Sequence, residues 1–318
     1  MEKAILVDKQ ANGVGLKKYL VRRSAEFAEV QILEKNEVLD SSVRCKDVKY
    51  LFSTWNMPVL SESQVQDYFP SLDAIFYAAG DTTYFSAPFA KRGVTIYCAR
   101  IENSVPVAEF VLGQVLLANK GYFQAQDVYR RGLWFFGFKK ARKLSQRKLG
   151  NKGATVGIIG FGAVGALVAS MLRTFDLKVV VHDPFVDDEK IQDSGVVRVD
   201  LDELFATSDV ISNHLPDIEE TRGLLNYSYF SSMKPDATFI NTGRGRQVEE
   251  SGLARAMRES PSRTALLDVT GREPPNPFSP LYRLKNVFLS PHIAGSQGQE
   301  IERLYQAVFQ QFLDHKGS

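Results

Sequence analysis

The stretch that decides the fold is Val156-Gly157-Ile158-Ile159-Gly160-Phe161-Gly162-Ala163-Val164-Gly165. An apolar run that would form a buried strand leads directly into three glycines spaced as GxGxxG, and a helical pattern follows over 167–172. Gly160 permits a tight turn, Gly162 lets a pyrophosphate approach the backbone, and Gly165 lets the helix lie close to the strand. The free N–H groups at the start of such a helix bind phosphate. The stretch therefore predicts a strand, turn and helix that bind a dinucleotide.

Downstream of this unit, short apolar runs alternate with helical windows. The runs lie near 155–159, 178–182, 210–215, 238–241, 264–269 and 287–289. This alternation is typical of a doubly wound parallel sheet. Asp183 follows Gly165 by 18 residues at the end of the second run, where a carboxylate binds the ribose 2′-hydroxyl of NAD and repels the 2′-phosphate of NADP. The alternative is that Asp183 only starts the turn before Pro184.

The first hundred residues follow a similar rhythm. Apolar runs near 4–7, 30–33, 50–53, 74–77 and 94–97 predict a second, smaller parallel sheet joined by helices. A helix that is apolar on nearly every side is expected from Asn103, either between two domains or against a second subunit. An amphipathic helix over 300–315 is expected to return to the first domain.

Composition limits the possible partners. The 318 residues carry a formal charge of +2 with 24% charged residues, so no overall attraction to nucleic acid or to an acidic membrane is expected. Cys45 and Cys98 have neither a CxxC pattern nor metal-ligand spacing, so no metal is expected. No apolar stretch approaches the roughly 20 residues of a membrane span, and the N-terminus lacks the pattern of a signal peptide. We expect a cytoplasmic protein.

One basic segment stands out within this balanced charge. Seven residues between Lys139 and Lys152 are Lys or Arg. A solvated loop is the simpler interpretation, and a patch that attracts an anionic substrate or cofactor is the alternative. The segment lacks the interleaved aromatic residues of a nucleic-acid surface.

Three ionisable residues lie in turns after the last three expected strands: Arg244 in Asn241-Thr242-Gly243-Arg244-Gly245, Glu273 in the stretch 268–274, and His292 in Ser290-Pro291-His292-Ile293-Ala294-Gly295. The guanidinium of an arginine suits a carboxylate or a polarised carbonyl. A histidine titrates near neutral pH, so it can give a proton to an oxygen that is receiving a hydride. Each residue alone would fit a surface ion pair or a structural turn, but their matching positions favour a shared site.

Together these motifs resemble the D-2-hydroxyacid dehydrogenase family over essentially the whole chain. The resemblance is carried by 103–109, 160–165, 182–184, 214–216 with Thr221, 241–245, 268–274 and 290–295. It implies an α/β protein with two Rossmann-like doubly wound parallel-sheet domains, the cofactor domain being inserted into a split substrate domain. We place the substrate domain at 1–101 plus 292–318 and the NAD-binding domain at 102–291. A homodimer formed largely through the helix after Asn103 is also implied.

The resemblance further implies a role for each site residue. Arg244 would bind the carboxylate and carbonyl of a 2-keto acid, and His292 would donate the proton in reduction and accept it in oxidation. Glu273 would hydrogen-bond His292 and favour its imidazolium form. Asp268 would contact the nicotinamide carboxamide or nearby backbone, and Thr242 the cofactor edge. Cofactor contacts are implied at Gly160, Gly162, Ala163, Val164, Gly165, Asp183, His214, Pro216, Thr221, Thr242, Asp268 and Gly295.

The expected substrate loop departs from the family pattern. Where the family carries a Gly-rich loop with an acidic residue near its end, this chain reads Tyr77-Ala78-Ala79-Gly80-Asp81-Thr82-Thr83-Tyr84. We expect the backbone N–H groups of Ala79 and Gly80 to bind the substrate carboxylate. The loop Trp55-Asn56-Met57 is expected to face the same cleft and to supply a bulky wall.

Two classes of function follow. The leading expectation is an NAD-dependent enzyme that interconverts a 2-keto acid and a D-2-hydroxy acid, with glyoxylate, hydroxypyruvate or a longer keto acid as candidates. Phosphoglycerate oxidation is also open. Formate oxidation is disfavoured because the Gln-Pro run that is distinctive of formate dehydrogenase is absent before His292. The alternative is an NAD(H)-sensing, corepressor-like binding protein of the same fold.

Overall fold

The computed structural model of the chain describes residues 2–40 and 45–317. It contains two compact units, one made of Met1–Ser104 with Ser296–Ser318 and the other of Val105–Gly295. The second unit is thus inserted between the two segments of the first. The units divide after Ser104 and after Gly295. The sequence placed these boundaries after residues 101 and 291, which are three and four residues earlier. His292 falls in the second unit, because its N–H donates to the carbonyl oxygen of Asp268 at 2.9 Å.

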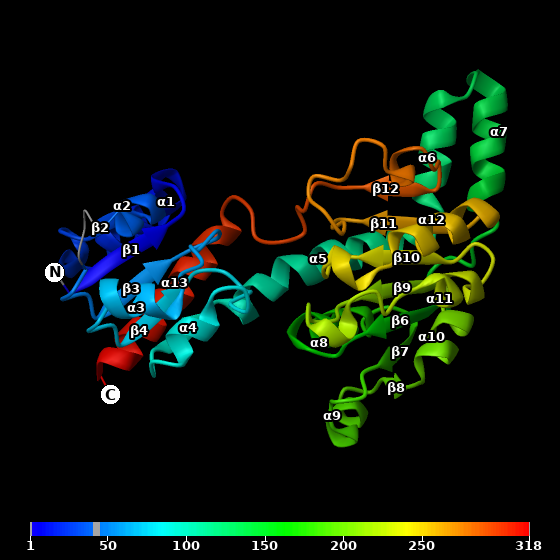
Figure 1. The fold of residues 1–318 in the computed structure, drawn as a ribbon. Coiled ribbons are helices and arrows are strands. Elements are labelled where there is room, and N and C mark those ends of the chain that lie inside the picture. The colour runs from blue at the N-terminus through cyan, green and yellow to red at the C-terminus, as the bar shows by residue number, and fades with distance from the viewer. Residues whose placement is uncertain (1, 41–44, 318) are drawn as a thin grey trace. The chain divides into compact units, whose positions relative to one another are not determined.

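The first unit is built on a five-stranded parallel sheet with the strand order β2-β1-β3-β4-β5 (Figure 1). Its strands are β1 (Lys3–Val7), β2 (Gln31–Glu34), β3 (Tyr50–Ser53), β4 (Ala74–Tyr77) and β5 (Thr95–Cys98). Its helices are α1 (Gln10–Arg23), η1 (Ala25–Phe27), α2 (Lys35–Leu39), α3 (Glu62–Tyr68), α4 (Ser86–Ala90) and α13 (Glu300–Gly317).

Helices cover both faces of this sheet, so its central strands read as continuous apolar runs. All four residues of β4 are buried, as expected for a parallel strand packed on two sides. On one face, Phe312 of the C-terminal helix α13 packs edge-on against Phe27, Phe52 and Phe76, with ring centroids 5.4–5.5 Å apart. The two ends of the chain therefore share one core.

The second unit is built on a seven-stranded parallel sheet with the order β12-β11-β10-β9-β6-β7-β8 (Figure 1). Its strands are β6 (Thr155–Ile159), β7 (Lys178–His182), β8 (Val197–Arg198), β9 (Val210–Asn213), β10 (Thr238–Asn241), β11 (Thr264–Leu267) and β12 (Val287–Leu289). Its helices are α6 (Tyr122–Arg131), α7 (Trp134–Ser145), α8 (Ala163–Leu172), α9 (Asp188–Asp193), α10 (Leu201–Thr207), η2 (Glu219–Thr221), α11 (Tyr227–Ser232), η3 (Gly245–Gln247), α12 (Glu250–Glu259) and η4 (Pro280–Tyr282).

The strand order of the second sheet reverses at β6. The chain runs from β6 outward through β7 and β8, and then returns to place β9 on the other side of β6. In open α/β sheets, ligands bind at such a reversal, outside the carboxyl ends of the strands. The GxGxxG turn lies at this point, since it connects β6 to α8.

Helix α5 (Arg100–Ala118) begins in the first unit and continues into the second. It begins three residues before the expected start at Asn103. Of the helices in the described part of the chain, α5 is the one long and apolar enough to cross a membrane by length and composition. Core helices pass the same test, and Ala108, Val111, Val115 and Ala118 are buried in a core cluster of the second unit.

Two features of the second unit differ from the sequence expectation. The short strand β8 was not expected, because two residues carry no periodic pattern. The basic segment 139–152, interpreted as a solvated loop, is helical as far as Ser145 and forms part of a hairpin of α6 and α7 (Figure 1). The correction has a simple cause: Lys, Arg, Ala and Leu dominate this segment and favour a helix.

The turn between β6 and α8 makes a stability prediction. A Cβ atom on Gly165 would lie 2.0 Å from the carbonyl oxygen of Gly160, whereas one on Gly162 would meet nothing within 4 Å. We therefore expect Gly165→Ala to lower the free energy of unfolding by about 3 kcal/mol and the control Gly162→Ala to change it by less than about 1 kcal/mol. Urea unfolding followed by circular dichroism measures both, and equal stability of the two variants would contradict the close packing.

Candidate active site

Three neighbouring strands of the second unit bring the candidate catalytic residues to one edge of the sheet. Arg244, Glu273 and His292 lie in the loops that follow β10, β11 and β12, which are adjacent and parallel. The first two loops touch: a Cβ atom on Gly245 would lie 1.9 Å from the carbonyl carbon of Thr270. The sheet order therefore gathers residues that are far apart in the sequence.

His292 and Glu273 form a direct pair. His292 Nδ1 lies 2.7 Å from Glu273 Oε2, and their side chains are 49% and 41% exposed. The carboxylate accepts the proton on Nδ1, which holds the ring in place and leaves the other ring nitrogen, Nε2, directed away from Glu273. In the described part of the chain, Nε2 has no hydrogen-bond partner. The imidazole can therefore offer this nitrogen to a ligand.

The backbone of His292 is strained. Its φ of 54° lies in the left-handed region that L-residues rarely adopt. Such a conformation persists only where its surroundings enforce it, and it is concentrated at functional sites.

Asp268 provides that enforcement. Its carboxylate is 3% exposed and accepts three hydrogen bonds from the turn around His292. The donors are Ser290 Oγ at 2.5 Å, Ile293 N–H at 3.0 Å and Ala294 N–H at 2.9 Å. Of the two contacts expected for Asp268, the structure contains the one to nearby backbone. The residue holds the turn that presents His292.

Arg244 lies in a tight turn between β10 and η3. Its Nη1 donates to the carbonyl oxygen of Gly243 at 2.9 Å, and its backbone N–H donates to Gln247 Oε1 at 3.1 Å. No motif in the sequence singles out Gln247. Its signal was weak, because a single glutamine after a Gly-Arg-Gly turn has no motif of its own.

The glycine loop suits a dinucleotide. Gly162 leaves an open cradle at the start of α8, where a Cβ atom would meet nothing within 4 Å. Asp183 directly follows the neighbouring strand β7, and its Oδ2 accepts the N–H of Phe161 at 2.7 Å, which ties the carboxylate to the loop. Among the residues that the structure describes, the buried Thr242 Oγ1 finds no hydrogen-bond partner, as expected of a hydroxyl that a ligand would satisfy. The residues present therefore fit the cofactor expected from the sequence.

Other expected cofactor residues form bonds within the protein. His214 Nε2 lies 2.9 Å from Ser212 Oγ, and burial lowers the pKa of His214 to about 4. It is therefore neutral near pH 7 and cannot serve as an acid there. The Thr221 hydroxyl bonds the carbonyl oxygen of Pro216 at 2.6 Å and shapes the 216–221 loop from within.

The expected substrate loop lies in the first unit, after β4. The N–H of Ala79 already donates to the carbonyl oxygen of Tyr77 at 2.8 Å. In the described part of the chain, the N–H of Gly80 has no such partner. The N–H of Ala79 is thus used within a tight turn, whereas that of Gly80 is not, and carboxylate binding by Ala79 and Gly80 stays a prediction. The hydroxyl oxygens of Tyr77 and Tyr84, which begin and end this stretch, lie 3.1 Å apart and share a hydrogen bond.

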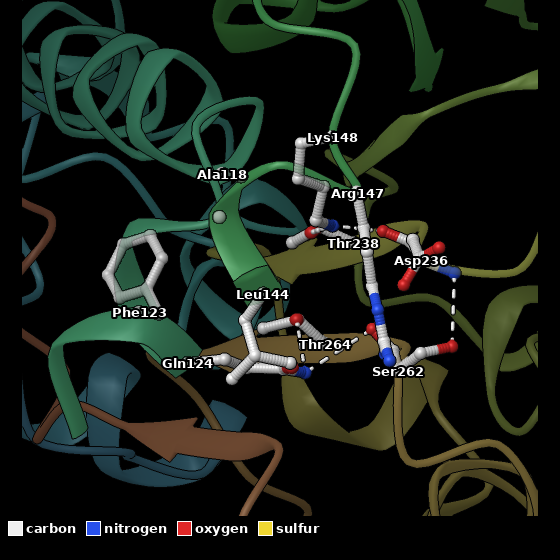
Figure 2. Close-up of a pocket in the computed structure, with 11 residues that line it drawn as sticks. Ala118, Phe123, Gln124, Leu144, Arg147, Lys148, Asp236, Thr238, Ser262 and Thr264 are labelled. Atoms are coloured by element: carbon white, nitrogen blue, oxygen red, sulfur yellow. Dashed lines mark hydrogen bonds between the residues drawn. The ribbon is translucent and has the colours of Figure 1, made fainter. Parts of the chain in front are cut away.

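A small cavity lies at the amino ends of strands in the second sheet, opposite the ends that carry the candidate catalytic residues (Figure 2). Its lining includes Thr238 and Thr264, the first residues of β10 and β11, whereas Arg244 and Glu273 follow the carboxyl ends of these strands. Lys148 Nζ donates to the carbonyl oxygen of Asp236, and burial lowers the pKa of Lys148 to about 8. The cavity measures about 10 Å³, the space of one water molecule. The hydrogen bond of Lys148 ties the segment after α7 to the residues before β10. The cavity itself has no room for a substrate.

Comparison with known proteins agrees with this geometry. Residues 112–294 match the family described as D-isomer specific 2-hydroxyacid dehydrogenase, NAD binding domain. The chain belongs to this family. Among the described residues, no group of His, Cys, Asp and Glu is arranged to hold a metal ion.

Individual relatives differ in length and name. The chain is 36% identical to D-3-phosphoglycerate dehydrogenase of Archaeoglobus fulgidus over 206 aligned residues. The alignment covers 65% of this chain and 38% of that protein. It is 32% identical over 249 residues to glyoxylate reductase of Thermofilum pendens, covering 76% of this chain and 71% of that one. Among solved structures, phosphoglycerate oxidoreductase from Vibrio cholerae aligns with a TM-score of 0.68 at 26% identity, over 100% of this chain and 99% of that one.

Proposed function

We propose that this protein is an NAD(H)-dependent oxidoreductase that interconverts a 2-keto acid and a D-2-hydroxy acid. The observation that carries the proposal is the pair of His292 and Glu273, which lie 2.7 Å apart in the loops after β12 and β11. The loop after β11 lies next to that of Arg244. An acid paired with a carboxylate beside a guanidinium suits a carbonyl that gains negative charge on oxygen. The sheet edge that carries the three residues also carries the glycine loop.

In the proposed reaction each residue of the site has a separate task. Arg244 binds the substrate carboxylate and carbonyl oxygen through its fork of N–H donors. His292 gives the proton on Nε2 to the carbonyl oxygen in reduction and takes it back in oxidation. Glu273 stabilises the imidazolium through Nδ1 and holds the ring. Gly80 would contribute a backbone donor for the carboxylate.

The cofactor proposed is NAD, which supplies or accepts the hydride when bound. The residues that would hold it are Gly160 to Gly165, Asp183, His214 to Pro216, Thr242 and Gly295. Gly162 and the first N–H groups of α8 would bind the pyrophosphate. Thr242 would donate its unpartnered hydroxyl, and Asp183 would accept from the ribose and disfavour the 2′-phosphate of NADP.

The natural substrate is proposed only as a class. Relatives are named for glyoxylate and for 3-phosphoglycerate, so glyoxylate, hydroxypyruvate, longer 2-keto acids and phosphohydroxypyruvate form the panel to test. A dinucleotide sensor is the second candidate, because it would use the same glycine loop. The cytoplasm is the proposed location, since two cysteines in 318 residues do not form the spacing pattern of a disulfide framework.

The catalytic proposal predicts the behaviour of His292→Ala. Loss of the proton donor should reduce turnover of NADH with the preferred 2-keto acid by a factor of about one hundred or more. The affinity for NADH, measured by fluorescence, should stay nearly unchanged because His292 follows β12, far along the sheet from the glycine loop after β6. A fully active variant would refute the assignment, and tight NADH binding without turnover of any acid by the parent would favour the sensor.

The cofactor proposal predicts the behaviour of Asp183→Ser. Removal of the carboxylate relieves its repulsion of a 2′-phosphate, so the ratio of kcat/KM for NADH to that for NADPH should fall about tenfold or more. The control Asp187→Ser changes a nearby acid that lies outside the end of β7. An unchanged ratio in Asp183→Ser would show that another residue selects the cofactor.

We also propose a homodimer formed through α5 and the adjoining hairpin of α6 and α7. The hairpin exposes an apolar tip, with Leu133 86%, Trp134 90% and Phe136 78% exposed. Exposed apolar patches of this kind mark interaction surfaces. Leu117, near the end of α5, is also exposed, at 41%.

The dimer proposal predicts the oligomeric state. Light scattering should find two chains per particle for the parent and one for Trp134→Asp, because a buried charge without a partner is costly. The matched control is Phe278→Asp, which alters a residue that is 80% exposed in another loop and should remain dimeric. A monomeric parent, or dimers in both variants, would contradict the proposed interface.

A further inference from the structure

Gln247 is a fully buried polar residue directly behind the turn of Arg244. It ends the short helix η3, and its exposed fraction is 0%. Burial of an amide costs free energy unless each end of it is hydrogen-bonded. In Gln247 both the amide oxygen and the amide nitrogen are hydrogen-bonded.

The acceptor end of Gln247 faces the turn. Its Oε1 accepts the backbone N–H of Arg244 at 3.1 Å and Asn213 Nδ2 at 2.6 Å. A backbone N–H can only donate, so this contact identifies the atom as oxygen. A Cβ atom on Gly243 would lie 2.9 Å from the same oxygen, which shows how closely the turn wraps around the amide.

The donor end of Gln247 faces the next loop along the sheet. Its Nε2 donates to the carbonyl oxygens of Leu215 at 2.5 Å and Pro216 at 2.9 Å. Carbonyl oxygens can only accept, so they identify this atom as nitrogen independently of the other end. A primary amide is the one side-chain group of this size that meets both demands.

Two further amides extend the contact across the ends of β9 and β10. Asn213 Nδ2 also donates to Asn241 Oδ1 at 3.0 Å, and that oxygen accepts the N–H of Gly243 at 3.1 Å. Asn213 and Asn241 are 0% and 1% exposed. The turn of Arg244 is therefore held from inside the sheet edge. Asn241 Nδ2 donates to the carbonyl oxygen of Arg244 at 3.3 Å, and Gln247 accepts the N–H of Arg244.

We propose that Gln247 is a positioning residue for Arg244, whose acceptor end orients the turn that presents the guanidinium to the substrate carboxylate. The inference rests on the proposed function, because it assumes that Arg244 binds a 2-keto acid. A buried, fully bonded network of this kind holds a loop in one geometry. A displacement of about 1 Å at a substrate-orienting group can reduce turnover about a hundredfold.

The test compares two replacements of similar size. Gln247→Met removes both the acceptor and the donors, whereas Gln247→Glu keeps an acceptor for Arg244 and loses the donors. Arg246→Gln, at an exposed neighbour in the same helix, is the control. The measurements are kcat and KM for the preferred 2-keto acid, the Kd for NADH from fluorescence, and the thermal unfolding midpoint.

We expect Gln247→Met to raise the KM for the 2-keto acid at least tenfold while the Kd for NADH changes less than threefold. Gln247→Glu should raise this KM by a smaller factor, between threefold and tenfold, and the control should match the parent. If the Met variant does not fold, the Glu variant alone decides, and an unchanged KM overturns the proposal. A Glu variant that does not fold overturns it as well, because the residue would then hold the fold itself.

Two outcomes separate this inference from the proposed function. A parent without turnover on any 2-keto acid contradicts the function, whatever the variants do. An active parent whose Met variant keeps its KM, or loses NADH affinity as much as substrate affinity, contradicts only the role of Gln247.

Discussion

The buried carboxylate of Asp268 is the constraint on which the candidate site depends. It accepts bonds from Ser290, Ile293 and Ala294, and so holds the turn in which His292 adopts a positive φ. Without that anchor the strained backbone would relax, and the imidazole would lose its direction towards Glu273. The site is thus rigid in its backbone although the His292 side chain is half exposed.

The same logic applies to Arg244 on the neighbouring strand. There, buried amides rather than a carboxylate hold the turn, and Gln247 meets fixed donors at one end and fixed acceptors at the other. In both turns the functional side chain reaches solvent, whereas the group that orients its backbone is buried. Flexible surface residues are in this way presented from a rigid sheet edge.

Much of this arrangement could be predicted from the sequence. Strands such as β6 and β10 lie where their apolar runs indicated, because a parallel strand buried on both faces is mainly apolar. Glu273 and His292 were predicted as a pair, and the structure places them 2.7 Å apart. The pattern failed where propensity was misread, as in α7, and where an element was too short to be periodic, as in β8. It also could not show that the Ala79 donor is already used.

By itself the sequence determined which residues end each strand, and therefore which side chains can meet at the carboxyl edge of a parallel sheet. It also determined the family, through the glycine turn at 160–165 together with the ordered motifs at 241–245, 268–274 and 290–295. Only the tertiary structure decided how those side chains are held. The positive φ of His292, the anchor provided by Asp268 and the bonds of Gln247 join residues from different loops. Hydrogen bonds between distant segments depend on three-dimensional proximity, which leaves no periodic trace along the chain.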